Sequence, residues 1–364
     1  MSEHEFGQGV PFSLGVEEEL LLVDPRDGRP AETGEEVLER LAHGLPGDAA
    51  SELHACEVEI ATPVVETVAE AVRALRELRA AIVATGASPI GCGLQPRDGS
   101  GQAEITPKAR YRRIRDLLGD AAATPVAGMH VHIGMPDPVT AIRAFNGLRR
   151  HLPLLQALAA NSPFRDDRDA GVQSARVLAM RAWVRTGVPR ALRDYDEWLE
   201  MSERLVRATE LPDYTFFWWK IRPHPRLGTV EVRTMDTQTS LEDTAALAAL
   251  VHALARHEAD APEVAAPAEE LLDEAMYRAA RYGVDGSLPD AEGELRPVGA
   301  VLTEALALAG PHARELGCEA ELEGIHRLVA DGGGAGRQRA VQARDGMPGL
   351  VDWLVRGTAG QALA

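Results

Sequence analysis

Three consecutive glutamates interrupt an apolar run near the start of the chain, in the stretch SLGVEEELLLVD at residues 13–24. Leu and Val at this density are typical of a buried strand, where an unpaired carboxylate is costly. Residues i and i+2 of a strand share a face, so Glu17 and Glu19 point one way and Glu18 points the other. The stretch therefore predicts a strand with negative charge on both faces, and each face requires compensating partners from elsewhere in the chain.

Three further apolar segments carry the same kind of spaced polar pair. The pairs are Glu57 and Glu59 in HACEVEIA, His130 and His132 in GMHVHIG, and Glu231 and Arg233 in TVEVRT. One such pair alone is more often solvated or structural than functional. Four together, built from carboxylate, imidazole and guanidinium groups, predict one shared polar face on a sheet.

The remaining pattern predicts an α+β fold. Strands are expected at residues 12–24, 53–61, 88–92, 127–135, 215–223 and 228–236, the last two forming a hairpin through HPRLG. Apolar residues recur at helical spacing in 64–86, 139–160, 241–258, 267–282 and 298–309, and Pro189 is a candidate start of another helix. We expect a largely antiparallel six-stranded sheet with helices packed on its outer side. No composition shift marks a boundary, so we expect a single domain spanning residues 1–364.

The net charge limits the classes of binding partner, and the cysteine pattern indicates the compartment. The chain has 38 Lys and Arg residues against 56 Asp and Glu residues, a formal net charge of −18. This balance argues against nucleic acid or an anionic membrane as the main partner. The cysteines, Cys56, Cys92 and Cys318, show no CxxC spacing and fit a reducing compartment. With neither a signal peptide nor a membrane-spanning stretch in the sequence, we expect a cytoplasmic protein.

The polar face has the composition of a site for hard divalent cations. Carboxylate oxygens suit Mg²⁺ or Mn²⁺, and these ions commonly bridge nucleotide phosphates. Bound cations would offset the repulsion among the glutamates, and nearby arginines would neutralise a transferring phosphoryl group. The sequence has no GxSxG motif and no convincing Cys/His pairing, so no covalent nucleophile is predicted.

The same motifs resemble those of a known family. GVEEELLLVDP, SELHACEVEIATPV, GMHVHIGMP, NSPF and IRPHPRLGTVEVRTMDTQ are similar to the YbdK-type carboxylate–amine ligases, the bacterial glutamate–cysteine ligase type 2 family. The resemblance implies a glutamine synthetase-like catalytic fold, in which the sheet forms a funnel-shaped active site. It also implies an ATP-dependent ligation, in which a glutamate γ-carboxylate becomes an acyl phosphate and an amine, of cysteine or of another compound, displaces phosphate to form an amide.

The resemblance further implies roles for individual residues. The expected ligands of Mg²⁺ or Mn²⁺ are Glu19, Glu52 and Glu59 around one ion, and Glu17, His130 and Glu231 around the ion that bridges the ATP phosphates. His132 is expected to contact nucleotide phosphate. Arg233 is expected to stabilise the transferring phosphoryl group, with Arg222 as a second catalytic candidate. The segments that face substrate contain Arg110, Tyr111, Ser174 and Arg176.

The Gly-rich segment ADGGGAGRQR, residues 330–339, contains Arg337 and Arg339 as candidate nucleotide contacts. It does not follow a predicted strand in the manner of a phosphate-binding loop. We therefore expect a flexible surface loop, with the two arginines as secondary candidates.

Other segments depart from the family pattern and leave alternatives open. The chain reads CGLQP where many relatives have Thr-His-Pro, and RDDRDAGVQSARVLAM follows NSPF where relatives carry aromatic residues. The acceptor amine, and glutamate as the donor, are therefore open. The competing hypotheses are a metal-dependent amidohydrolase and a catalytically idle relative that binds an amino acid or nucleotide. Expected partners are small molecules, and the family suggests a homo-oligomer.

Overall fold

A mostly antiparallel sheet organises the computed structural model, which describes residues 4–97, 103–262 and 267–361. Its strands run in the order β2-β3-β1-β5-β9-β8, and a short β4 pairs with the end of β1. Their bounds are β1 Leu14–Leu22, β2 Asp48–Ser51, β3 Glu57–Ala61, β4 Pro89–Ile90, β5 Gly128–Gly134, β8 Ile221–His224 and β9 Thr229–Asp236. The expected α+β class and antiparallel sheet are confirmed. The sheet has seven strands rather than six, because β2 was not predicted from DAAS, which lacks the branched and aromatic residues that favour strands.

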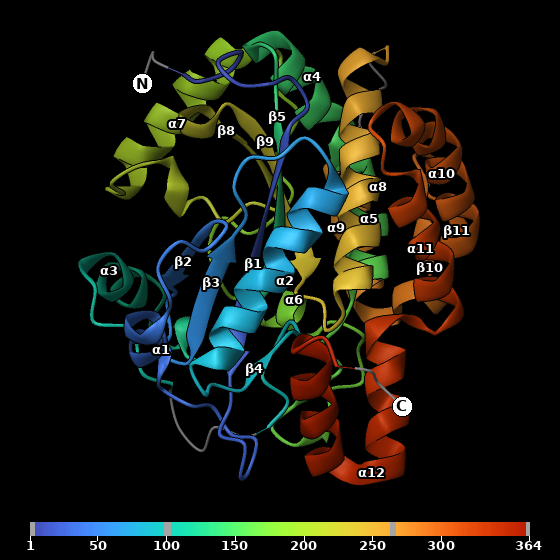
Figure 1. The fold of residues 1–364 in the computed structure, drawn as a ribbon. Helices are drawn as coiled ribbons and strands as arrows, with labels where there is room; N and C mark the ends of the chain where they lie inside the picture. Colours follow the sequence, from blue (N-terminus) through green and yellow to red (C-terminus); the bar gives the residue numbers. More distant parts are fainter. Residues whose placement is uncertain (1–3, 98–102, 263–266, 362–364) are drawn as a thin grey trace.

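Helices cover the apolar face of this sheet. α2, Val68–Ala84, and α8, Leu241–Asp260, lie against β1 and β5 (Figure 1). α4, Pro138–Leu148, and α5, Leu152–Ala159, continue the layer over β9. α8 is buried on nearly every side, because α10, Val298–Glu315, and α11, Glu319–Ala330, pack on its outer surface. The core therefore lies between the sheet and α8, and it leaves the other face of the sheet to polar side chains.

Two helices contribute side chains to that polar face, α3 Ala109–Leu118 and α6 Ala175–Met180. α1 Gly34–Arg40 packs against β2, and α7 Tyr195–Thr209 packs against α4. The remaining elements are α9 Glu269–Tyr282 and the two-stranded pairs β6 Phe164–Arg165 with β7 Arg168–Asp169, and β10 Ser287–Pro289 with β11 Leu295–Pro297. None of the helices in the described ranges is long and apolar enough to span a bilayer.

The predicted helix start at Pro189 is wrong. α7 begins six residues later, because Asp194 is its N-cap and accepts a hydrogen bond from the backbone N–H of Glu197 at 2.8 Å. The residues between Pro189 and Asp194 form no helix. Pro189 is only tolerated at a helix start, whereas Asp194 accepts a hydrogen bond from a free amide group of the first turn. The aspartate therefore determines where the helix begins.

The expected surface loop at residues 330–339 is also wrong. α12, Gly333–Thr358, begins inside this segment and is kinked at Gly346, where φ is +71°. Gln338 anchors its first turns by donating to the backbone and side-chain oxygens of Asn161, both at 2.8 Å. In Figure 1, α12 lies at the C-terminal end of the chain, near β4. Tertiary contacts thus hold a glycine-rich start in a helix that local sequence preference disfavours.

Candidate active site

A cavity of about 440 Å³ lies on the polar face of the sheet. Its walls include all six predicted metal ligands, Glu17, Glu19, Glu52, Glu59, His130 and Glu231. They also include six residues that were predicted from the strand faces and the substrate segments: His132, Arg110, Tyr111, Arg176, Arg222 and Arg233. Ser174 is the one predicted residue of these segments that does not line the cavity. The fold has therefore gathered side chains from six separate stretches of the sequence into one site.

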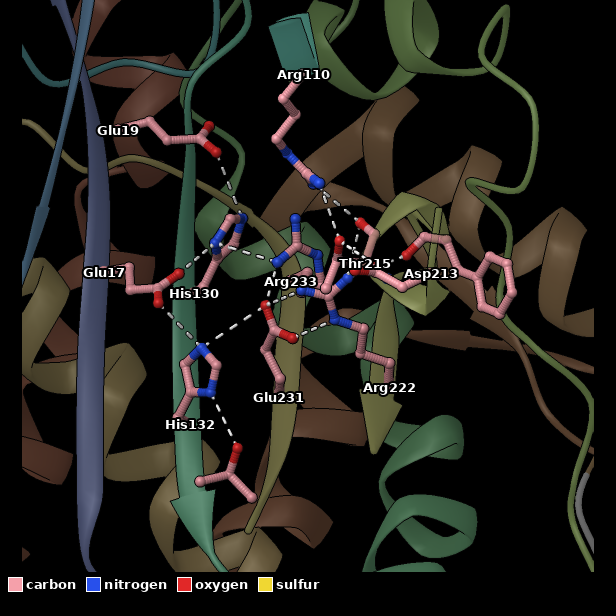
Figure 2. A network of polar contacts seen from close by, with 12 residues as sticks. Glu17, Glu19, Arg110, His130, His132, Asp213, Thr215, Arg222, Glu231 and Arg233 are labelled. Atoms are coloured by element: carbon pink, nitrogen blue, oxygen red, sulfur yellow. Dashed lines mark hydrogen bonds and ion pairs between the residues drawn. The ribbon is translucent and has the colours of Figure 1, made fainter. Parts of the chain in front are cut away.

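Strand register produces this convergence. Glu19 stands opposite Glu59 across β1 and β3, and Glu17 stands opposite His130 across β1 and β5. His132 stands opposite Glu231 across β5 and β9. Directly opposed residues of antiparallel strands point to the same face and lie close enough to interact. Figure 2 shows the side chains of β1, β5 and β9 pointing toward one another.

A bulge in β9 changes the direction in which its side chains point. Met129 pairs with Met235, but Val131 pairs with Val232, so Arg233 and Thr234 together stand opposite His130. An extra residue of this kind bends the strand and redirects a side chain. The guanidinium of Arg233 consequently lies beside His130, with Nη1 at 3.5 Å from Nδ1. No periodic reading of TVEVRT predicts this irregularity.

The polar atoms of the site form a connected network. His130 Nδ1 lies 3.0 Å from Glu17, and His132 Nε2 lies 3.3 Å from Glu17 and 3.6 Å from Glu231. Glu231 accepts from both flanking arginines: Arg222 Nε donates at 2.5 Å and Arg233 donates to the other oxygen. Figure 2 shows these contacts as a chain from Glu17 to Arg222.

The electrostatics divide the carboxylates into two groups. Burial alone would raise the pKa of Glu231, but Arg222 and Arg233 hold it far below its usual range. Burial likewise opposes ionisation of Glu17, while His132 and His130 hold its pKa well below normal. On the other side, burial and the charge of Glu19 raise the pKa of Glu52 to about 8.

The pKa of Glu59 is also raised. Burial is the largest cause, followed by the charges of Glu17 and Glu52. The charges of Arg110 near Glu52 and of Arg233 near Glu59 offset these rises only in part. Unlike Glu231, neither Glu59 nor Glu52 has an arginine in an ion pair among the residues that the structure describes. A carboxylate cluster without ion-paired arginines is an environment that a bound metal ion stabilises.

Two groups of three side chains fit a divalent cation. Glu17, Glu59 and His130 bring ligand atoms within 4.8 Å of one another, and so do Glu17, His132 and Glu231. The nitrogen Nε2 of His132 lies at ion-pair distance from Glu17 and Glu231 without a well-aligned hydrogen bond to the described part of the chain. Carboxylate oxygens with one imidazole suit Mg²⁺ or Mn²⁺. The grouping differs from the one that the family resemblance implied, because Glu17 is common to both groups and His132 joins the second.

The remaining predicted residues lie at the rim or outside the cavity. Arg110 Nη1 donates to Thr215 Oγ1 at 3.0 Å at the cavity wall (Figure 2), and Tyr111 donates to the backbone oxygen of Ser51. Ser174 is fully buried and donates to Asp236 at 3.0 Å, so it supports the wall from behind. Its predicted contact with substrate does not follow from this position.

Arg337 and Arg339 do not line the cavity. Arg337 forms an ion pair with Asp243 at the start of α8. Arg339 donates to both oxygens of Asp169, at 2.7 and 2.9 Å. These contacts hold α12 against neighbouring segments. Both arginines therefore stabilise the packing of α12, outside the cavity that contains the glutamates.

Sequence reasoning missed several cavity residues. Lys220, Asp213 and Arg226 line the wall, and Arg226 Nη2 lies 3.0 Å from Asp213. Lys220 sits in WWKIRP, two residues before Arg222, which was the available signal. The strand expected at residues 215–223 would place both on one face, but β8 begins only at Ile221, after a 3-10 turn at Tyr214–Phe216.

Comparisons with known proteins identify the family of this chain. Residues 13–356 match the model of glutamate-cysteine ligase family 2. A Rubrobacter xylanophilus protein provisionally named glutamate–cysteine ligase 2-3 is 42% identical, over 98% of this chain and 100% of its own length. The glutamate–cysteine ligase of Haloferax volcanii is 34% identical, over 94% of this chain and 96% of its own.

A solved structure shares the fold at low identity. The crystal structure of glutamate–cysteine ligase from Francisella tularensis, determined in complex with AMP, has a TM-score of 0.73 and 13% identity to this chain. The match covers 97% of this chain and 89% of that one. From the family match over nearly the whole sequence, the shared fold and the acidic cavity, we conclude that the chain belongs to glutamate–cysteine ligase family 2 and is an ATP-dependent carbon–nitrogen ligase.

Proposed function

We propose that this ligase joins an amino-acid carboxylate, the γ-carboxylate of glutamate, to an amine through an acyl phosphate intermediate. The observation that carries the proposal is the position of Glu17 in both groups of candidate metal ligands, next to the arginine pair on Glu231. Two cation sites that share a carboxylate, with a guanidinium beside them, suit the transfer of a phosphoryl group.

The reaction consists of two displacements. A carboxylate oxygen of the donor attacks the γ-phosphorus of ATP, the bond to the β–γ bridging oxygen breaks, and ADP leaves. The amine nitrogen then attacks the acyl carbon, and the carbon–oxygen bond to phosphate breaks with its electron pair. The nitrogen loses a proton, and the products are the amide, ADP and phosphate.

Arg233 has the main catalytic role among the residues of this chain. Burial would lower its pKa, but Glu231, Glu17 and Glu19 raise it, so the guanidinium stays charged. A fixed positive charge at this point stabilises the equatorial oxygens of the transferring group. Glu231 orients it, because its two oxygens are held by Arg233 and Arg222.

Divalent cations on the glutamates and histidines would supply charge neutralisation and alignment for the ATP phosphates. The pKa of Glu52 and of Glu59, both raised by burial and by neighbouring carboxylates, supports this assignment. Arg222 is 7% exposed and also donates to the backbone oxygen of Thr215 at 3.2 Å. We therefore propose Arg222 as a positioning residue for Glu231 rather than as a direct contact of phosphate.

The test is a reaction of the purified protein with ATP, Mg²⁺, glutamate and a pool of amines and amino acids. ADP release and new masses are followed together. The expected result is an ATP-dependent product whose mass is the sum of two substrates minus water. Arg233→Met should abolish this product, while Arg204→Met, which alters an exposed i,i+4 ion pair on α7, should not.

The alternative functions give different results. An amidohydrolase would consume an amide substrate without ATP and respond to Zn²⁺. An idle relative would bind ATP or an amino acid and release no ADP with any donor. Either result would overturn the proposed ligation.

A further inference from the structure

Lys220 is a buried amine that forms no hydrogen bond with the part of the chain that the structure describes. The residue is 6% exposed and lines the cavity. Burial, and next the charge of Arg176, lower the pKa of Lys220 to about 7. A buried ammonium without a partner destabilises a fold. The chain contains only two lysines among its 38 basic residues, and the other, Lys108, is exposed.

Arg176 is a second cation in the same wall with an unused donor. It is 2% exposed, and its Nε has no hydrogen bond within the described part of the chain. Its Nη1 lies 3.7 Å from Asp236 and 3.4 Å from the backbone oxygen of Thr234. Asp236 is itself fixed by Ser162 and Ser174, at 2.7 and 3.0 Å. The network behind Arg176 therefore holds the guanidinium in place and leaves one of its N–H groups free.

Apolar side chains accompany both cations. Arg176 and Met180 are four residues apart in α6, so they lie on the same face of that helix. Trp218 and Lys220 are two residues apart before β8, and all four line the cavity. Trp183 completes this wall, with its ring centroid 5.3 Å from that of Trp218. Each of the two segments thus contributes one cation and one apolar surface.

We propose that Lys220 and Arg176 bind the carboxylate of an amino-acid substrate whose body lies against Met180, Trp183 and Trp218. This inference rests on the proposed function, because the bound amino acid is a substrate only if the protein catalyses the proposed ligation. A carboxylate fits better than a phosphate, because a phosphate group has no apolar part to place on the tryptophans. The glutamate and histidine cluster with Arg233 already offers a separate environment for phosphates.

The experiment measures binding directly, so that it does not depend on turnover. Glutamate, cysteine, valine and phenylalanine, and the matched amines that lack the carboxylate, are titrated into the wild-type protein, Lys220→Met and Lys108→Met in the presence of Mg²⁺ and ADP. Binding is followed by calorimetry and by tryptophan fluorescence. Mg²⁺–ADP itself is titrated separately, and the thermal unfolding midpoint of each variant is recorded.

We expect wild type and Lys108→Met to prefer at least one amino acid over its matched amine by about tenfold or more, and Lys220→Met to lose that preference. Affinity for Mg²⁺–ADP should be unchanged, and the unfolding midpoint of Lys220→Met should not fall. The inference is overturned if wild type binds none of the amino acids, if the preference survives in Lys220→Met, or if only Mg²⁺–ADP binding weakens. Binding that depends on Lys220 in a protein that forms no amide would retain the inference and reject the proposed ligation.

Discussion

Glu18 and Arg79 form a buried ion pair on the face of β1 opposite to the cavity. Arg79 Nε and Nη2 each donate to Glu18 at 2.8 Å, and Thr244 Oγ1 donates to the same carboxylate at 2.7 Å. Arg79 also donates to the backbone oxygens of Gln238 and Thr239. The three consecutive glutamates therefore have two tasks: Glu17 and Glu19 face the cavity, and Glu18 joins β1 to α2 and α8.

Glu18→Gln should destabilise the protein by about 3 kcal/mol, because it leaves the charge of Arg79 buried without its partner. Urea unfolding followed by circular dichroism measures the change. The double variant Glu18→Leu/Arg79→Met removes both charges and should recover most of the loss. A single variant as stable as wild type would contradict this role for the pair.

Glu17→Gln should weaken cation binding, with a smaller loss of stability than Glu18→Gln, because Glu17 is partly exposed and its partners are imidazoles. Glu17 belongs to both candidate ligand groups, so its loss should lower Mn²⁺ affinity at both sites, by about tenfold or more. Titration of Mn²⁺ followed by electron paramagnetic resonance counts the sites and measures their affinities. Glu66→Gln, an exposed residue before α2, is the matched control. Equal affinities in the two variants would reject the ligand assignment.

Glu231→Gln should abolish ATP turnover and also lower stability, by about 3 kcal/mol, since Arg222 and Arg233 both lose their counter-charge. Turnover is measured by ADP release, and stability by urea unfolding at a temperature where the variant is folded. The combination separates Glu231 from Glu17, for which loss of activity is expected without a large loss of stability. A variant that retains most of its turnover would exclude Glu231 from the site.

Stability should fall in acid through a second buried cluster, remote from the cavity. Glu258 accepts from Arg150 Nη2 at 2.6 Å and lies 2.7 Å from His151 Nε2. Burial would raise the pKa of Glu258, but His151 and Arg150 lower it from 4.5 to about 2. The contribution to stability is therefore complete above the unfolded-state pKa and is lost as the pH falls toward about 2.

His151 acts in the same direction. Burial lowers its pKa, so the folded protein keeps the ring neutral and protonation favours the unfolded chain as the pH falls. Between pH 6 and pH 3, wild type should lose about 2 kcal/mol more than Glu258→Gln in its free energy of unfolding, because the folded-state pKa of Glu258 lies at about 2 rather than 4.5. Parallel pH profiles for the two proteins would show that this cluster does not contribute.

The sequence by itself determined the most regular part of the protein. Alternation in GVEEEL, HACEVEIA, GMHVHIG and TVEVRT identified the strands and which side chains share a face, because the side-chain period of a strand is two residues whatever its neighbours are. The requirement that a buried carboxylate be compensated then predicted an acidic, cation-binding face, and the structure places Glu17, Glu19 and Glu59 together there.

Only the tertiary structure decided the rest. Sheet order and register choose which strands are neighbours, and so they determine that Glu17 meets His130 and that Glu18 meets Arg79, 61 residues away. The bulge that directs Arg233 depends on the pairing of β9 with β5. Lys220 and α12 depend on tertiary structure in the same way. Long-range contacts, rather than local preference, place this buried lysine at the cavity and a glycine-rich segment in a helix.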